Sequence, residues 1–166
     1  VDGAREDRTF EVYQAHLGSA ICALGQGSDE RIYGTNIYGM HLCAIDQDTD
    51  AVADLGYTWS GGELYHVHAH GDKLYVGSYG GSYIGVYDPQ QPWNPGFDED
   101  CNPRNWGVLG QDQNRPFEVC SGPDGRIYVA NRSNYGVPGG ALASYDPATG
   151  DKVSMGAVVF GAGPED

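Results

Sequence analysis

Short stretches in which apolar and polar residues alternate run along most of the chain. Each is bounded by Gly, Asp-Gly or Asp-Pro, which favour tight turns, and no long stretch has the period of a helix. One stretch, with the pattern Arg/Lys-Ile/Leu-Tyr-Gly/Val, occurs at 31–34, 73–76 and 126–129. The alternation predicts a β-strand in each copy, and the lack of helical stretches predicts an all-β chain.

The segments around this stretch recur in the same order, which indicates an internal repeat. A strand ending in an acidic turn follows it, at 43–46, 85–89 and 143–147. The next strand closes on Leu-Gly or Met-Gly, at Leu17, Leu55, Leu109 and Met155. A fourth strand leads back into the repeated stretch, at 20–24, 65–70 and 117–121. Four strands, repeated at intervals near the roughly 40–50 residues of a propeller blade, predict a β-propeller.

We predict one domain over residues 1–166, a propeller segment of three complete four-stranded antiparallel blades plus one extra strand at each end. The blades are expected at about 19–56, 64–110 and 116–156, with flanking partial blades at 10–18 and 157–166. A propeller ring closes with roughly four to eight blades. The expected partners therefore include further blades, from the same polypeptide or from other chains. We favour the same polypeptide, because a chain that assembled with its own copies would more naturally begin and end at blade boundaries.

The longest copy of the repeat carries a family resemblance. It consists of two segments, Gly-Pro-Asp-Gly-Arg-Ile-Tyr-Val at 122–129 and Gly-Gly-Ala-Leu-Ala-Ser-Tyr-Asp-Pro-Ala-Thr-Gly at 139–150. This pattern resembles the bacterial propeller superfamily with NHL, kelch-like and quinoprotein-like blades. The likeness covers about residues 10–166. Similar blades occur in secreted polysaccharide lyases, in carbohydrate-binding modules and in interaction scaffolds, so the resemblance implies a fold and not one chemistry. The Trp-Asp dipeptide of WD40 repeats and the tryptophan docking motif of quinoproteins are absent, so no cofactor is expected.

The net charge of the chain excludes some classes of binding partner. Asp and Glu number 23 against 9 Lys and Arg, which gives a formal net charge of −14. Nucleic acids and anionic membranes are held by basic patches, so neither is an expected partner. No apolar run approaches the roughly 18–20 residues of a membrane span, and the start of the sequence lacks the regions of a signal peptide. We expect a mature or trimmed soluble chain in an extracellular or periplasmic location.

The sharpest local signal is a row of three histidines, His66, His68 and His70, on the predicted innermost strand of the second blade. Period-two alternation places all three imidazoles on one side of the strand. Our catalytic candidates are His66, His68 and Arg115, with an imidazole as general base and the arginine neutralising a substrate carboxylate. Two alternatives stay open: a packing row hydrogen-bonded to backbone carbonyls, and a transition-metal site completed by His41 or Glu118. We predict no metal.

Ligands of propellers usually bind on the face where the loops entering the innermost strands meet the loops between the second and third strands. In this chain those loops are aromatic and polar, with Tyr57, Trp59, Tyr79, Tyr83, Asn131, Arg132, Asn134 and Tyr135. As substrate-binding residues, which stack on sugar rings or hydrogen-bond sugar hydroxyls, we predict Trp59, Tyr83, Asn131, Arg132 and Tyr135. The alternative is that the aromatic side chains cover the junctions between blades.

Two other clusters predict no dedicated site. The acidic segment 46–50 begins like a calcium loop, but Ala51 and Tyr57 stand where such a loop needs Gly and Glu, so a turn is expected. The cysteines, Cys22, Cys43, Cys101 and Cys120, have no Cys-x-x-Cys spacing. Cys22 and Cys43 are expected to lie too far apart for a disulfide. Cys101 could reach Cys120, but we expect buried free thiols unless such a bond forms.

These observations leave two classes of function. The first is a carbohydrate-binding or carbohydrate-active propeller, whose enzymatic form is a lyase acting on a uronate-containing glycan. The second is a noncatalytic protein-interaction scaffold, a segment of a larger or multichain propeller. The partner is accordingly a carbohydrate or another protein.

Overall fold

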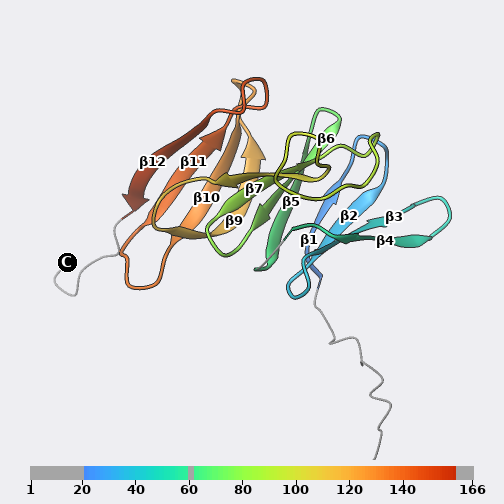
Figure 1. The fold of residues 1–166 in the computed structure, drawn as a ribbon, viewed down its shortest axis with the longest axis horizontal. Coiled ribbons are helices and arrows are strands. Elements are labelled where there is room, and N and C mark those ends of the chain that lie inside the picture. Colours follow the sequence, from blue (N-terminus) through green and yellow to red (C-terminus); the bar gives the residue numbers. More distant parts are fainter. Residues whose placement is uncertain (1–20, 60–61, 160–166) are drawn as a thin grey trace, which may run out of the picture.

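The computed structural model describes residues 21–59 and 62–159. Three antiparallel sheets of four strands each make up this part of the chain, with blade 2 between blades 1 and 3 (Figure 1). The described residues contain no helix, and so none that could cross a membrane. The all-β propeller-blade architecture predicted from the repeats is confirmed.

The strands follow the chain from the inside of each blade outwards. Blade 1 contains β1 (Ile21–Gln26), β2 (Ile32–Asn36), β3 (His41–Ile45) and β4 (Val52–Tyr57). Blade 2 contains β5 (Leu64–His70), β6 (Lys73–Ser78), β7 (Tyr83–Tyr87) and β8 (Arg104–Val108). Blade 3 contains β9 (Gln113–Ser121), β10 (Ile127–Ser133), β11 (Gly140–Tyr145) and β12 (Lys152–Val159). The innermost strand β5 packs against both of the other innermost strands, β1 and β9.

Some strand ends differ from the sequence prediction. The inner strand β9 begins at Gln113 rather than at 117, so Arg115 lies within the strand and not in the loop before it. The outer strand β12 continues to Val159, so residues 157–159 belong to blade 3 and not to a following innermost strand. The predicted flanking strand at 10–18 and residues 160–166 lie outside the described residues.

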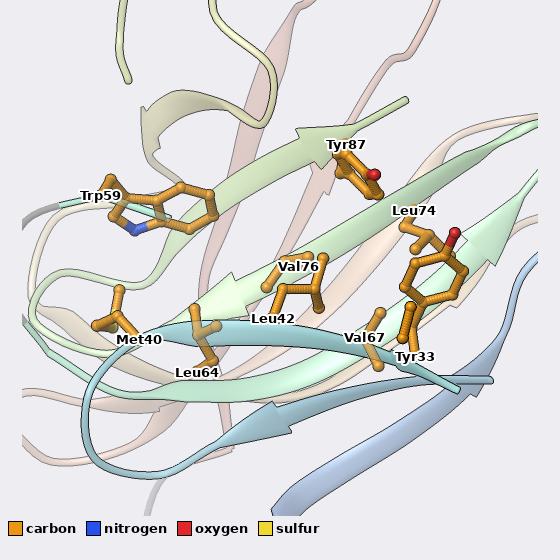
Figure 2. Close-up of a cluster of buried hydrophobic side chains, with 10 residues drawn as sticks. Tyr33, Met40, Leu42, Trp59, Leu64, Val67, Leu74, Val76 and Tyr87 are labelled. Carbon is orange, nitrogen blue, oxygen red and sulfur yellow. The ribbon is translucent and has the colours of Figure 1, made fainter. Parts of the chain in front are cut away.

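Alternation along each strand divides every blade into two faces. We call the face toward the next blade in the sequence the front and the face toward the preceding blade the back. Figure 2 shows the core between blades 1 and 2, where Tyr33 and Leu42 from the front of blade 1 meet Leu74 and Val76 from the back of blade 2. A second core lies between blades 2 and 3, and buries Tyr75, Ile84, Leu109, Val119, Ile127, Val129, Ala143 and Tyr145. Adjacent residues such as Leu74 and Tyr75 therefore pack against different neighbours.

Each innermost strand carries a one-residue bulge at the same place in the repeat. The extra residues are Cys22 in β1, Tyr65 in β5 and Phe117 in β9. The Cys22 thiol donates to the Tyr65 carbonyl at 3.8 Å, and the Tyr65 and Phe117 rings meet edge to face with centroids 5.9 Å apart. A bulge breaks the alternation of side chains and re-aims one of them. In β5 the bulge turns Tyr65 toward blade 3.

Candidate functional site

Arg115 is the centre of an arginine–tyrosine cluster that contains Tyr65, Tyr79, Arg115 and Tyr135. The Arg115 Nε donates to the Tyr65 hydroxyl at 3.0 Å, and Nη2 donates to the Tyr135 hydroxyl at 2.8 Å. The guanidinium carbon lies 4.3 Å from the ring centroid of Tyr79 and 5.4 Å from that of Tyr135. The hydrogen bonds that Arg115 donates to Tyr135 and Tyr65 raise its pKa, so the group stays cationic. The phenol rings face the cation as in cation–π pairs.

The cluster is assembled from two blades. Tyr65 lies near the start of β5 and Arg115 near the start of β9, while Tyr79 and Tyr135 come from the loops between the second and third strands of blades 2 and 3. Asn114, next to Arg115, ties these loops together: its carbonyl accepts from the Ser82 amide at 3.1 Å, and its side-chain amide donates to the Asn134 side chain at 3.2 Å. The cluster thus stands on the face where the sequence predicted a ligand site.

The charge at the cluster is positive and incompletely balanced. In the described part of the chain no carboxylate forms an ion pair with Arg115. The nearest acidic link is indirect, because the Tyr65 hydroxyl donates to Glu63 at 2.6 Å. Hydrogen bonds with Arg115 and then with Tyr79 lower the pKa of Tyr135, while the bond with Tyr135 raises the pKa of Tyr79. The arrangement suits an anion that carries an apolar ring face.

The histidine row faces the inner strand of blade 3. His66 Nε2 lies 3.3 Å from Glu118 Oε1, and His68 Nε2 and His70 Nδ1 each lie 2.8 Å from the Ser121 hydroxyl oxygen. Within the described residues, the hydrogen-bond and ion-pair partners of the row are therefore side chains. A hydroxyl has one proton, so Ser121 can donate to only one of the two imidazoles and must accept from the other. Burial, followed by the charges of His66 and His70, lowers the pKa of His68 and favours its neutral form.

The three catalytic candidates, His66, His68 and Arg115, thus all lie where β5 packs against β9, and each takes part in a different contact between the two strands. Arg115 meets β5 at Tyr65, and the next residue along β5, His66, meets β9 at Glu118. His68 follows on the same side of β5, against Ser121. From the sequence, Glu118 was considered only as a possible metal ligand and Ser121 was not named, because their place opposite the row depends on the packing of two blades.

The remaining predicted residues divide between surface and core. Tyr135 is 67% exposed, Arg132 is exposed and Tyr83 is half-buried. Trp59 is only 3% exposed, its indole N–H donates to Ser78 Oγ at 3.1 Å, and it covers the junction of blades 1 and 2. Asn131 is 6% exposed, accepts from the Ser82 hydroxyl and donates to the Val129 carbonyl. Neither Trp59 nor Asn131 presents the open surface expected from the sequence.

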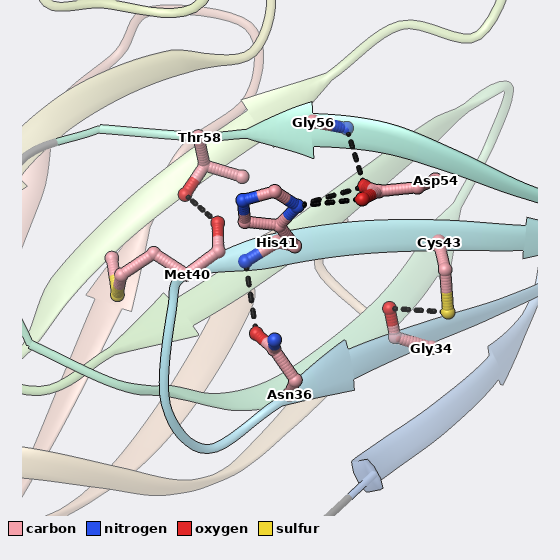
Figure 3. Close-up of polar contacts among 8 residues, drawn as sticks. All are labelled: Gly34, Asn36, Met40, His41, Cys43, Asp54, Gly56 and Thr58. Carbon is pink, nitrogen blue, oxygen red and sulfur yellow. Dashed lines mark hydrogen bonds and ion pairs between the residues drawn. The ribbon is translucent and has the colours of Figure 1, made fainter. Parts of the chain in front are cut away.

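His41 lies in blade 1, where its side chain contacts a carboxylate of the same blade. Its Nδ1 lies 2.8 and 2.9 Å from the two carboxylate oxygens of Asp54, which also accepts a hydrogen bond from the Gly56 amide at 2.9 Å. Figure 3 shows these contacts. Its backbone amide donates to Asn36 at 2.9 Å. His41 is thus held by its own blade and does not complete a set of ligands with the histidine row.

Among the described residues, the group of side chains spaced for a metal ion is Asp98, Asp100 and Cys101, in the loop between β7 and β8. It does not include the histidine row. The segment 46–50 forms a turn in which Asp46 accepts the Asp48 and Thr49 amides, as expected. All four cysteines are free thiols.

Comparison with known proteins shows the fold. No protein-family model and no curated protein matches the chain. Solved structures do match, with TM-scores of 0.63 for a streptogramin B lyase, 0.63 for a catalytically inactive virginiamycin B lyase from Staphylococcus aureus with quinupristin, and 0.62 for hydrazine synthase from Kuenenia stuttgartiensis. The identities are 11%, 10% and 16%, and the matches cover 85%, 82% and 80% of this chain.

The same matches cover 42%, 41% and 36% of the three solved chains. The chain thus spans less than half the length of the structures that it resembles. At these identities the likeness concerns the fold alone: the chain has propeller blades and corresponds in length to part of a larger propeller.

Proposed function

We propose that this chain belongs to a carbohydrate-binding propeller in which Arg115 holds the carboxylate of a uronate residue. The observation that carries the proposal is the arginine–tyrosine cluster: a cation without a carboxylate partner in the described chain, flanked by phenol rings on the loop face. In a protein of net charge −14, such a group is a local exception. The expected location stays extracellular or periplasmic, where such glycans are met.

The geometry leaves donors for a ligand. A guanidinium has five N–H groups, and the tyrosine hydroxyls accept two of them, from Nε and Nη2. The remaining N–H groups can bind a carboxylate, which matches the planar fork of arginine. Tyr135, which is 67% exposed, offers a ring for stacking against the sugar. Arg132 and Tyr83 belong to the proposed surface as hydrogen-bonding groups at its edge.

The enzymatic form of the proposal is a β-elimination. A general base removes the proton beside the uronate carboxylate, the electron pair forms a carbon–carbon double bond, and the glycosidic oxygen leaves and takes a proton. Arg115 would stabilise the charge that develops on the carboxylate. Two groups suit the base: Tyr135, in the loop between β10 and β11, whose pKa is lowered, and His68 of the histidine row, whose lowered pKa favours the neutral imidazole.

Calorimetry with oligogalacturonate and with a neutral galactose oligomer tests the binding step. We expect the acidic oligomer alone to bind, and Arg115→Gln to weaken its binding at least about tenfold, because a charge-assisted bidentate contact is lost. Arg115→Lys keeps the charge but not the fork and should also weaken binding. Arg31→Gln, which removes an equal charge from an exposed position in blade 1, is the matched control. Equal affinity for Arg115→Gln and Arg31→Gln would contradict the proposal.

Ultraviolet absorbance of the new double bond separates lyase from lectin. If the chain is a lyase, His68→Ala or Tyr135→Phe should abolish turnover and leave oligomer binding within a few-fold. If it is a lectin, the wild type forms no unsaturated product and the same variants change affinity only. A chain that binds neither oligomer favours the second candidate function, a noncatalytic scaffold.

A further inference from the structure

Ser121 carries a hydroxyl that is held between two imidazoles. It is the exposed last residue of β9, and β9 packs against β5, whose last residue is His70. The Ser121 Oγ lies 2.8 Å from His68 Nε2 and 2.8 Å from His70 Nδ1. The buried apolar core between blades 2 and 3 is made by other residues of these blades. The hydroxyl and its two partners therefore lie beside the core, at a surface that a substrate can reach.

The hydrogen bonds of Ser121 assign different roles to the two imidazoles. Because a hydroxyl has one proton, it donates to one ring and accepts from the other. Burial lowers the pKa of His68 and favours its neutral form, in which one ring nitrogen has no proton. With that nitrogen at Nε2, His68 accepts the Ser121 proton, and His70 Nδ1 donates to the Ser121 oxygen. The serine thus faces a neutral base on one side and an N–H donor on the other.

A carboxylate stands close enough to stabilise the protonated form of His68. The charge of Glu118 acts to raise the pKa of His68, against the larger lowering by burial. Its Oε1 lies 3.3 Å from His66 Nε2, on the neighbouring histidine of the row. A base that is neutral at rest and has a negative charge nearby when it takes a proton is suited to activate a serine.

We propose that Ser121 is a nucleophile with His68 as its general base, and that this site hydrolyses esters of short carboxylic acids. The Ser121 oxygen attacks the carbonyl carbon of the ester while its proton passes to His68 Nε2. The bond from that carbon to the alcohol oxygen then breaks, and the alcohol leaves with the proton from His68. Water, which gives a proton to the same imidazole, attacks the acyl-serine. The acid is released, and Ser121 recovers its proton from His68.

His70 completes the site as the donor to the developing oxyanion. Its Nδ1 lies 2.8 Å from the attacking oxygen, so the carbonyl oxygen of an ester bonded to Ser121 comes next to the same N–H. The side chains bonded to Ser121 are polar and Ser121 is exposed, which suits an acetyl ester better than a long acyl chain. The inference does not rest on the proposed uronate binding, because Arg115 takes part in no step.

Labelling with diisopropyl fluorophosphate, which phosphorylates activated serines and releases fluoride, tests the nucleophile. We expect a label at Ser121, located by peptide mass spectrometry, which distinguishes it from the neighbouring free thiol of Cys120. Ser121→Ala should lose the label. His68→Gln should slow labelling at least about tenfold, because general-base catalysis contributes roughly 10²–10⁴-fold. Ser154→Ala, at an exposed serine of the outer strand β12, is the matched control and should be labelled at the wild-type rate.

Release of nitrophenol from p-nitrophenyl acetate and p-nitrophenyl decanoate tests turnover. We expect the acetate to be hydrolysed faster, and Ser121→Ala to lose this activity while circular dichroism shows unchanged strand content. Ser121→Ala should still bind oligogalacturonate like the wild type, which separates this activity from the uronate site.

Four results would overturn the proposal. They are a wild-type chain that is not labelled at Ser121, labelling at Ser121 that is unchanged in His68→Gln, ester turnover that is equal in Ser121→Ala, and faster turnover of the decanoate than of the acetate.

Discussion

Gly85 lies directly beneath the indole ring of Trp59, and a side chain there would exclude the ring. A Cβ atom at position 85 would stand 2.0 Å from Trp59 Cη2 and 2.5 Å from Cζ3. Gly85→Ala should therefore destabilise the chain by about 1–3 kcal/mol, as overpacking of a rigid aromatic core does. Urea unfolding measures this. In a Trp59→Leu background the same substitution should cost less than about 1 kcal/mol; an equal cost in both backgrounds would place its cause outside this contact.

His68 links the histidine row to the pH dependence of stability. Its pKa is lowered from the ordinary 6.5, first by burial and then by His66 and His70. The unfolded chain therefore binds more protons than the folded chain as the pH falls through 6.5, and stability decreases in that direction. We expect urea midpoints to drop between about pH 7 and pH 5, and to drop less in His68→Gln. A pH profile that is identical in the variant would contradict this assignment.

At the scale of the strand, local pattern was enough to predict the repeats. The strands β2, β6 and β10 follow from alternation between turn residues, and the histidines face one side of β5 as alternation requires. The face of the blade on which the Tyr65 side chain lies could not be predicted, because a one-residue bulge in β5 reverses it. The burial of Trp59 depends on Gly85, which lies in another blade. Local patterns do not record such contacts between blades, so the arginine–tyrosine cluster emerged only from the structure.

The loop between β7 and β8 is organised by one buried side chain. Asn102 is 9% exposed; its Oδ1 accepts the Asp88 amide at 2.8 Å, and its Nδ2 donates to the carbonyls of Asp88, Gln91 and Pro92 at 2.9–3.2 Å. Asn102→Asp should destabilise the loop by about 1–3 kcal/mol, because a carboxylate would face carbonyls with no proton to donate. Limited proteolysis should then cleave within 89–101 at least several-fold faster. Asn94→Asp, which removes a single bond of 3.3 Å, is the control and should change the rate little.

At the scale of the whole molecule, apolar packing and net charge oppose each other. The chain carries a formal charge of −14, so its acidic side chains repel one another in the folded state, while the cores between the blades bury apolar side chains. Salt screens the repulsion and leaves the apolar contacts nearly unchanged.

The urea midpoint of the folded chain should therefore rise when the salt concentration rises from about 0.02 M to about 0.3 M, a range over which the Debye length shrinks to less than about 10 Å. Urea unfolding at a series of salt concentrations measures this. If attractive ion pairs outweighed the repulsion, the midpoint would fall in salt, and that result would contradict net repulsion among the acidic side chains. Arg31→Gln makes the net charge more negative and should give a steeper rise with salt than the wild type.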